Sequence, residues 1–147
     1  MLWVTRQKPH ADRCASAWLI KRFIDRDAVF EFITKEQEIP KGGIGFTLPK
    51  AEINPVEGIK TTFDSLVEKY HVIDPGVLRI KEMIRDYEFN EENPGRIRLK
   101  ETLGICYVLK GLEKTSQTDD ETVSKAIFVM DALYATLKEL AEYIGLI

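Results

Sequence analysis

The sequence predicts a helix-rich α+β fold in which a small, partly parallel N-terminal sheet, with a βαβ start, packs with several C-terminal helices. Two observations lead to this prediction. Short β-favouring segments flank one helical segment within residues 2–33. Beyond them, apolar positions recur with a helical period that is clearest over residues 118–147. The length of 147 residues suits one domain, taken as residues 1–147.

The first three elements are predicted to form the βαβ unit. Residues 2–5, LWVT, are a short apolar segment typical of a buried strand. Pro9 interrupts this strand, Asp12 is a suitable N-cap, and apolar positions at helical spacing then extend to Phe23. Residues 28–33, AVFEFI, form the second strand. A strand, a helix and a strand in so short a span predict parallel pairing with a right-handed crossover.

The middle of the chain is predicted to be a loop followed by a helix. Residues 39–51 contain two prolines and three glycines, which predict a loop with one short strand at residues 45–48. The helix is capped by Thr61 or Thr62 and ends near Tyr70.

Three further helices complete the prediction. The first has Asp74 as its N-cap, and the second covers about residues 99–112. The last begins with a capping box formed by Thr118 and Glu121. Its apolar positions keep the helical period to the end of the chain: Val123, Ile127, Met130, Leu133, Tyr134, Leu137, Leu140, Ala141 and Ile144.

The composition argues against several classes of protein. A net charge of −3 makes nucleic acid an unexpected partner for this chain alone. The two cysteines, Cys14 and Cys106, lie far apart, so neither a disulfide scaffold nor a cysteine-rich zinc site is expected. Cys14 falls in the first helical turn, where a thiol can be activated, but a cysteine among alanines is more often a packing residue. Short apolar runs and the absence of a signal-peptide pattern predict a cytoplasmic protein without a membrane span.

Five side chains gather where the first strand leads into the first helix: Thr5, Arg6, His10, Asp12 and Arg13. Ligands collect beyond the carboxyl ends of parallel strands, and a helix N-terminus favours anions. We therefore expect Thr5, Arg6 and Arg13 to bind an anion, because guanidinium groups suit oxyanions. His10 and Asp12 would support the site. The alternative is that Asp12 caps the helix, Arg13 pairs with a carboxylate and His10 is an exposed turn residue.

Asp131 is a further candidate, because it interrupts the apolar stretch AIFVMDALYA. No charged residue lies one helical turn away, so we expect Asp131 to be buried and paired with an arginine, Arg13 or Arg22. Alternatively, Asp131 marks the solvent-exposed edge of the last helix.

Asp64, Asp86 and Glu88 form a possible set of metal ligands. Together they could hold a hard cation such as magnesium or manganese. A solvated surface is the alternative, because carboxylates are frequent along this chain. The sequence identifies no cofactor. With few histidines and no cysteine cluster, any bound ion should be a hard divalent cation held by oxygen atoms.

The segment WVTRQKPHADRCASAWLIKRFID resembles the opening of the C-terminal domain of ChrB-type chromate-resistance proteins, roughly W-V-T-R-x-x-P-x-x-D-R-x-A-C-x-W-L-I-R-R-F-x-D. The resemblance continues in order through GIKTTFDSL, MIRDYEF, TLGICYVLKGL and MDALYA. Family cysteines and histidines are replaced here, at Ser16, Val56, Thr61 and Arg85. The residues that match are Thr5, Arg6, Asp12, Arg13, Trp18, Arg22, Asp64 and Asp131, with Glu88 as a near match. This is an arginine–carboxylate set rather than a soft-metal set.

The resemblance implies a stand-alone ChrB-like domain that binds or senses a small oxyanion or metal ion, or that supports a chromate-responsive regulator. Longer family members carry an N-terminal region, so the DNA-binding part of a regulator is expected to be missing here. One alternative is a divalent-metal-dependent enzyme acting on a small anionic substrate, with Arg13 as an electrophile. Another is a structural or partner-binding domain. Whether the chain is an enzyme stays open, and an oligomer is possible.

Overall fold

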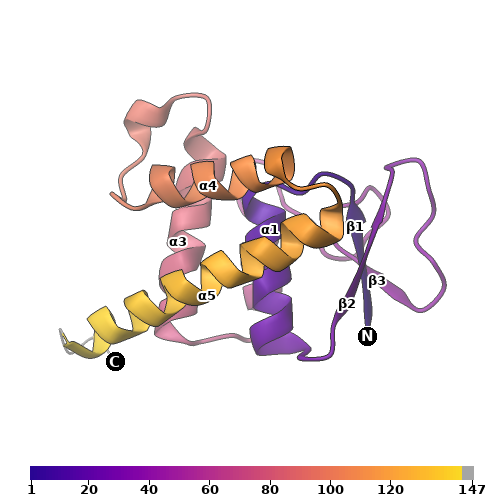
Figure 1. The fold of residues 1–147 in the computed structure, drawn as a ribbon, viewed down its shortest axis with the longest axis horizontal. Helices are drawn as coiled ribbons and strands as arrows, with labels where there is room; N and C mark the ends of the chain where they lie inside the picture. The colour runs from indigo at the N-terminus through magenta and orange to yellow at the C-terminus, as the bar shows by residue number, and fades with distance from the viewer. Residues whose placement is uncertain (144–147) are drawn as a thin grey trace.

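A computed structural model describes residues 1–143 and shows the expected helix-rich α+β architecture, with a small parallel sheet beside a larger group of helices (Figure 1). The strands are β1 (Leu2–Arg6), β2 (Val29–Ile33) and β3 (Gly43–Gly45). The helices are α1 (Ala11–Leu19), α2 (Thr62–Lys69), α3 (Pro75–Asn90), α4 (Thr102–Thr115) and α5 (Asp119–Tyr143). A π-helical turn at Ile20–Ile24 extends α1, and a 3₁₀ turn at Pro94–Arg96 precedes α4.

The sheet has the strand order β2-β1-β3, and both neighbours of β1 run parallel to it. The predicted parallel pairing of the first two strands is therefore confirmed, with Val4 opposite Glu31. The predicted strand at residues 45–48 is wrong in position, because β3 ends at Gly45. Glycines are depleted in strands, but here a side-chain carbon at Gly45 would lie 2.5 Å from the end of the Ile39 side chain and 3.0 Å from Ala51, so a larger residue would require Ile39 to move.

The central strand β1 separates two hydrophobic clusters. Trp3 belongs to the main core, which the helices complete. Val4 points to the other face and packs with Ile33 and Leu48 in a smaller cluster. Alternate side chains of a strand point to opposite faces, so a fully buried central strand needs apolar residues on both.

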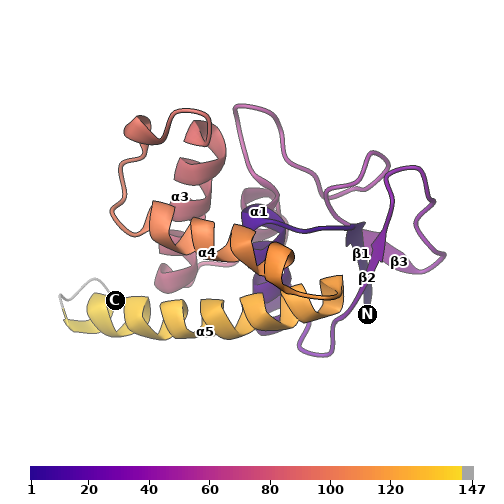
Figure 2. The ribbon, with the colours of Figure 1, turned by 45° about the horizontal axis from the view of Figure 1, so that its top comes forward.

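Helix α1 lies at the centre of the helical part and contacts the four other helices. Small buried residues such as Ala15 and Ala17 allow close approach. Trp18 fills the space toward α5 and stacks at an angle against Tyr134. Figure 2 shows α5, the longest helix, running from beside the sheet to the opposite end of the molecule. The elements on either side of the β1–α1 junction are thus fixed by a continuous core.

Most helix starts match their predictions. Thr61 caps α2 and Asp74 caps α3, each by accepting a hydrogen bond from a backbone N–H. Thr118 accepts from the Glu121 N–H at the start of α5, but the Glu121 side chain accepts from Gln117 rather than from Thr118 itself. The predicted periodic position Ile144 lies outside the described residues. No helix within residues 1–143 has the length and apolar character needed to cross a membrane.

Candidate functional site

The short segment between β1 and α1 is the centre of the candidate site. After the carboxyl end of β1 the chain turns at Lys8, whose φ of 57° lies in the left-handed region. The Lys8 N–H donates to the Asp119 carboxylate at 3.1 Å, which ties the turn to α5. His10 is the N-cap residue of α1 but makes no side-chain capping bond. Two depressions open beside this segment, and His10 and Arg13 line both of them.

The guanidinium of Arg13 holds the turn together. It donates to the carbonyl oxygen of Arg6, to that of Gln7 at 3.3 and 3.4 Å and to that of Lys8 at 2.9 Å. A planar fork with several N–H groups suits this arrangement of carbonyl oxygens. Burial lowers the pKa of Arg13 from its usual value. Arg13 therefore fixes the backbone and pairs with no carboxylate within residues 1–143, while its charge stays beside both depressions.

Thr5 also serves the fold. Its hydroxyl donates to the Phe46 carbonyl oxygen at 2.7 Å, and the residue is only 1% exposed. This bond fastens the chain that follows β3 to β1. Arg6, the next residue, has an exposed side chain at the rim of one depression.

We call this first hollow the basic depression. It has a volume of about 620 Å³ and is lined by basic residues from several segments: Arg6, Lys8, Arg13, Lys35 and Lys114. The carboxylates on its wall are Glu36 and Glu113, and His10 lies 3.7 Å from the latter. Positive charge therefore prevails there, although the whole chain carries a net charge of −3.

Asp12 lies on the other side of α1 and caps a different helix from the one predicted. Its carboxylate accepts hydrogen bonds from the N–H groups of Thr62 at 2.9 Å and Phe63 at 3.0 Å, at the start of α2. The expectation that Asp12 caps α1 is wrong, because the side chain of this second helical residue reaches the free N–H groups of the neighbouring helix. Burial raises the pKa of Asp12 to about 6, although both N–H groups act in the opposite direction.

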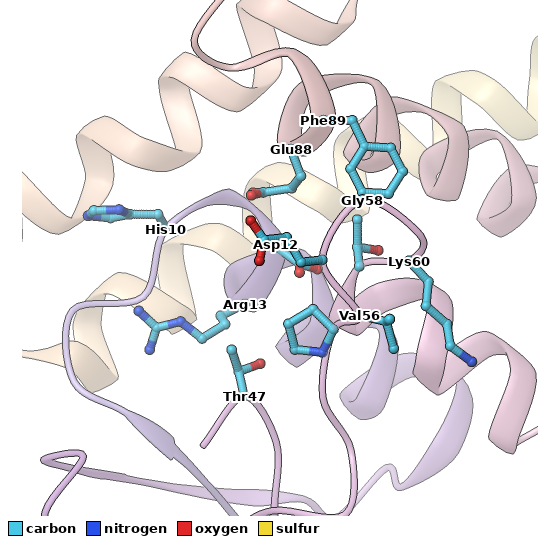
Figure 3. A pocket seen from close by; sticks show the side chains of 12 residues that line it. His10, Asp12, Arg13, Thr47, Val56, Gly58, Lys60, Glu88 and Phe89 are labelled. Atoms are coloured by element: carbon cyan, nitrogen blue, oxygen red, sulfur yellow. The ribbon is translucent and has the colours of Figure 1, made fainter. Parts of the chain in front are cut away.

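Glu88, in the last turns of α3, faces Asp12 across the second hollow, which we call the carboxyl cavity (Figure 3). The cavity measures about 340 Å³. Burial and the nearby carboxylates of Asp12 and Glu91 raise the pKa of Glu88 to about 7, whereas a backbone hydrogen bond from Asp12 and the charge of Arg13 lower it. Other wall residues are Thr47, Pro55, Val56, Glu57, Lys60 and Phe89.

The three predicted metal ligands do not come together. Asp64 accepts from the Thr61 N–H and pairs with Arg85 at 2.8 Å. Asp86 accepts from the N–H groups of residues 98 and 99, before α4, while Glu88 faces the carboxyl cavity. Within residues 1–143 no group of three or more histidines, cysteines or carboxylates is placed to hold a metal ion. Asp64 and Asp86 therefore serve as anchors for helix ends.

Asp131 joins α5 to the end of the α1 segment. It accepts from Arg22 through two bonds of 3.0 and 2.8 Å and from the Trp18 indole at 2.9 Å. Pairing with Arg22 confirms the predicted arginine partner, and Arg22 lowers the pKa of Asp131. The expected burial is wrong, since the Asp131 side chain is 42% exposed. An exposed pair of this kind contributes only about 0.2–1 kcal/mol.

Neither cysteine is an activated thiol. Both are buried, and burial raises the pKa of Cys14 and of Cys106 to about 12. A thiol in such surroundings stays protonated at neutral pH and is unreactive. Packing is therefore the role of Cys14 in the first turn of α1.

Sequence reasoning missed Lys35 and Lys114 in the basic depression and Thr47 in the carboxyl cavity. Lys35 follows β2, the parallel neighbour of β1, and that adjacency could have revealed it. Lys114 reaches the depression from the end of α4, for which the sequence carries no signal. Thr47 has a φ of 56°, which is uncommon for a β-branched residue, and its hydroxyl bonds that of Thr62 at 2.7 Å.

Comparison with known proteins identifies a protein family that the chain matches. The chain matches the family described as ChrB, C-terminal domain, over residues 3–137. It is 31% identical over 133 residues to Protein ChrB of Cupriavidus metallidurans, which covers 90% of this chain and 39% of that relative. The chain therefore spans less than half the length of this relative. No solved structure matches the chain significantly. The match over nearly the whole chain confirms the resemblance found in the sequence.

Proposed function

Because the chain belongs to the family of ChrB C-terminal domains of chromate-resistance proteins, we propose that it binds a small divalent oxyanion in the basic depression. One observation carries the proposal. Basic side chains from the β1–α1 turn, the end of β2 and the end of α4 converge at the carboxyl end of a parallel sheet. Convergence from segments far apart in sequence is typical of a binding site rather than of a solvated turn.

The side chains that would meet the anion differ from those first expected. Arg6, Lys8, Lys35 and Lys114 have charges that can turn toward a ligand, whereas the Arg13 fork is occupied by backbone carbonyl oxygens. Arg13 would hold the turn in shape and so place the Lys8 side chain where it can contact the anion. Long-range attraction from the remaining cations would supply most of the affinity, so binding should weaken as salt screens these charges.

The N-terminus of α1 is not the anion site in this proposal. The Glu88 carboxylate already faces the backbone N–H of Asp12, so an internal group interacts with the positive end of this helix. An external oxyanion would therefore rely on the side chains of the basic depression.

Two other functions receive less support. A divalent-metal-dependent enzyme needs a ligand set, and Asp64 and Asp86 are both engaged at helix ends. A purely structural or partner-binding domain would not need the convergence of cations in the basic depression. For the wider role of the protein, we propose that oxyanion binding supports a chromate-responsive regulator.

Isothermal titration calorimetry with sulfate and chromate at low ionic strength tests the proposal. We expect Lys35→Glu and Lys114→Glu each to weaken binding by about tenfold or more, since each reverses a charge beside the ligand. Lys138→Glu makes the same charge change on exposed α5 and should bind as the wild type does. The proposal fails if the wild type binds neither anion, or if all three variants bind alike.

A further inference from the structure

The N-terminal turn of α1 connects the two hollows. His10 and Arg13 line both, and Asp12, which precedes Arg13, points into the carboxyl cavity. Figure 3 shows the carboxyl groups of Asp12 and Glu88 facing each other, while the Arg13 guanidinium points away from them. A charge placed near Arg13 therefore acts on a pair of carboxyl groups just behind it.

The pair is held by three helices. Asp12 belongs to α1 and is bonded to the first N–H groups of α2, and Glu88 comes from α3. Neither side chain forms an ion pair with a cation within residues 1–143. Two carboxylates held close together in a partly buried site cannot both ionise easily, so they titrate as a unit.

The charged groups around this pair come from several elements. On α1 and its entry, Arg13 and His10 line the same cavity, and the charge of Arg13 lowers the pKa of Glu88. From α2, Asp64 raises the pKa of Asp12, although its own charge is paired with Arg85.

The other neighbours come from α3, the loop before α2 and α4. Glu91 on α3 raises the pKa of Glu88. Glu57 and Lys60 of the loop line the same cavity, and the Cys106 thiol of α4 stays protonated nearby. Burial outweighs the favourable contributions, and the pKa values reach about 6 for Asp12 and about 7 for Glu88.

We propose that Asp12 and Glu88 share one proton at neutral pH and take up a proton when an anion occupies the basic depression. The second part rests on the proposed function. An anion beside Arg13 offsets its positive charge, and this charge is one of the effects that keep Glu88 ionised. Filling the basic depression thus favours protonation of the pair. Coupling between sites is reciprocal, so oxyanion affinity should rise as the pH falls from about 8 to about 6.

The shared proton is tested on the ligand-free protein by following the side-chain carboxyl carbons of ¹³C-labelled protein by NMR against pH. We expect two carboxyl groups to titrate between about pH 6 and 7, and both transitions to change in Glu88→Gln. Glu57→Gln alters the same cavity and should leave both titrations at the wild-type pH values. Ordinary titration of both groups, near pH 4, would overturn the pair.

Proton uptake is tested by calorimetry with sulfate near pH 6.5 in two buffers of different ionisation enthalpy. Sulfate stays fully ionised at this pH, so any proton taken up binds the protein. All three proteins carry His10→Gln, because imidazole groups exchange protons in this pH range and His10 lines the basic depression. In this background we expect up to about one proton per sulfate with the native carboxyl pair and in Glu57→Gln, and close to none in Glu88→Gln, which still binds sulfate. Equal uptake in all three proteins would overturn the coupling. A protein that binds no sulfate would overturn the coupling together with the proposed function, whereas the NMR result would decide the shared proton separately.

Discussion

The two hollows beside the start of α1 use charge in opposite ways. In the basic depression, Lys35 and Lys114 are like charges on flexible side chains that do not hold the fold together. In the carboxyl cavity, Asp12 and Glu88 are partly buried, and Asp12 is bonded to the backbone of another helix. The charged groups that can contact a ligand therefore lie only one helical turn away from the charged groups that support the fold.

Arg13 lies between these two kinds of charge. Its N–H groups are committed to carbonyl oxygens of the β1–α1 turn, as in a structural residue, but its charge acts on both hollows. The comparison predicts that substitutions in the carboxyl cavity change stability and its pH dependence. Substitutions in the basic depression should change anion binding instead.

The largest effect is expected for Asp12→Ala. Removal of this carboxylate leaves the Thr62 and Phe63 N–H groups at the start of α2 without their partner. We expect the free energy of unfolding to fall by about 2–4 kcal/mol, measured by urea denaturation. Asp27→Ala removes an exposed carboxylate and should change stability by less than about 0.5 kcal/mol. Equal stability of the two variants would show that Asp12 is dispensable to the fold.

A smaller effect is expected for Arg13→Lys. Lysine keeps the charge, but its single ammonium nitrogen lacks the planar fork whose two nitrogens reach the carbonyl oxygens of Arg6, Gln7 and Lys8. We expect a loss of about 1–2 kcal/mol of stability and a partial loss of sulfate affinity, because Lys8 is no longer held in place. Arg26→Lys, at an exposed position, is the matched control for denaturation and calorimetry. If Arg13→Lys retains full stability, the turn does not depend on the planar guanidinium group.

Much of the fold could be predicted from the sequence, because local signals agree with the tertiary structure. The caps at Thr61 and Asp74 and the parallel pairing of β1 with β2 are examples. The bounds of strand β3 could not be predicted, since Gly43 lies where a side chain would crowd Val4 and Pro40, and strand propensity does not favour glycine. Local propensity does not report crowding by a residue such as Val4, which lies far away in the sequence on the neighbouring strand.

The site was harder to predict than the fold. The β1–α1 junction was recognised, but the directions of its side chains were not. Asp12 reaches α2 and Arg13 reaches the backbone behind it, and neither contact follows from spacing along the chain. The sequence indicates Glu88 as a possible metal ligand and as a near match to the family pattern, but not as a neighbour of Asp12, because its approach to Asp12 depends on how α3 packs against α1.

The pH dependence of stability separates the carboxyl cavity from ordinary surface carboxylates. The pKa values of Asp12 and Glu88 rise on folding, from 3.8 to about 6 and from 4.5 to about 7. The folded protein thus binds more protons than the unfolded chain in this range. This stabilisation is complete below about pH 4 and is lost as the pH rises through about 7.

Glu88→Gln removes the part of this dependence that Glu88 contributes. We expect the variant to be more stable than the wild type by about 1–2 kcal/mol at pH 8, with the difference shrinking toward pH 4.5. Urea denaturation at both pH values measures it. Glu57→Gln, in the same cavity but exposed, should follow the wild type. A Glu88→Gln protein that is less stable at pH 8 would show that the ionised carboxylate stabilises the fold.

The smallest effect on stability is expected in the basic depression. Lys35→Ala combined with Lys114→Ala removes two cations that crowd the same hollow and have no hydrogen bond within residues 1–143 to lose. The unfolding free energy should change by less than about 0.5 kcal/mol, or rise slightly as repulsion is relieved. Sulfate binding, however, should weaken by more than tenfold at low salt, and the difference should shrink as salt screens the wild-type charges. Lys41→Ala combined with Lys138→Ala removes the same charge from exposed positions elsewhere and serves as the control. If the depression variant unfolds more easily but binds sulfate normally, these lysines support the fold, and the contrast between the two hollows disappears.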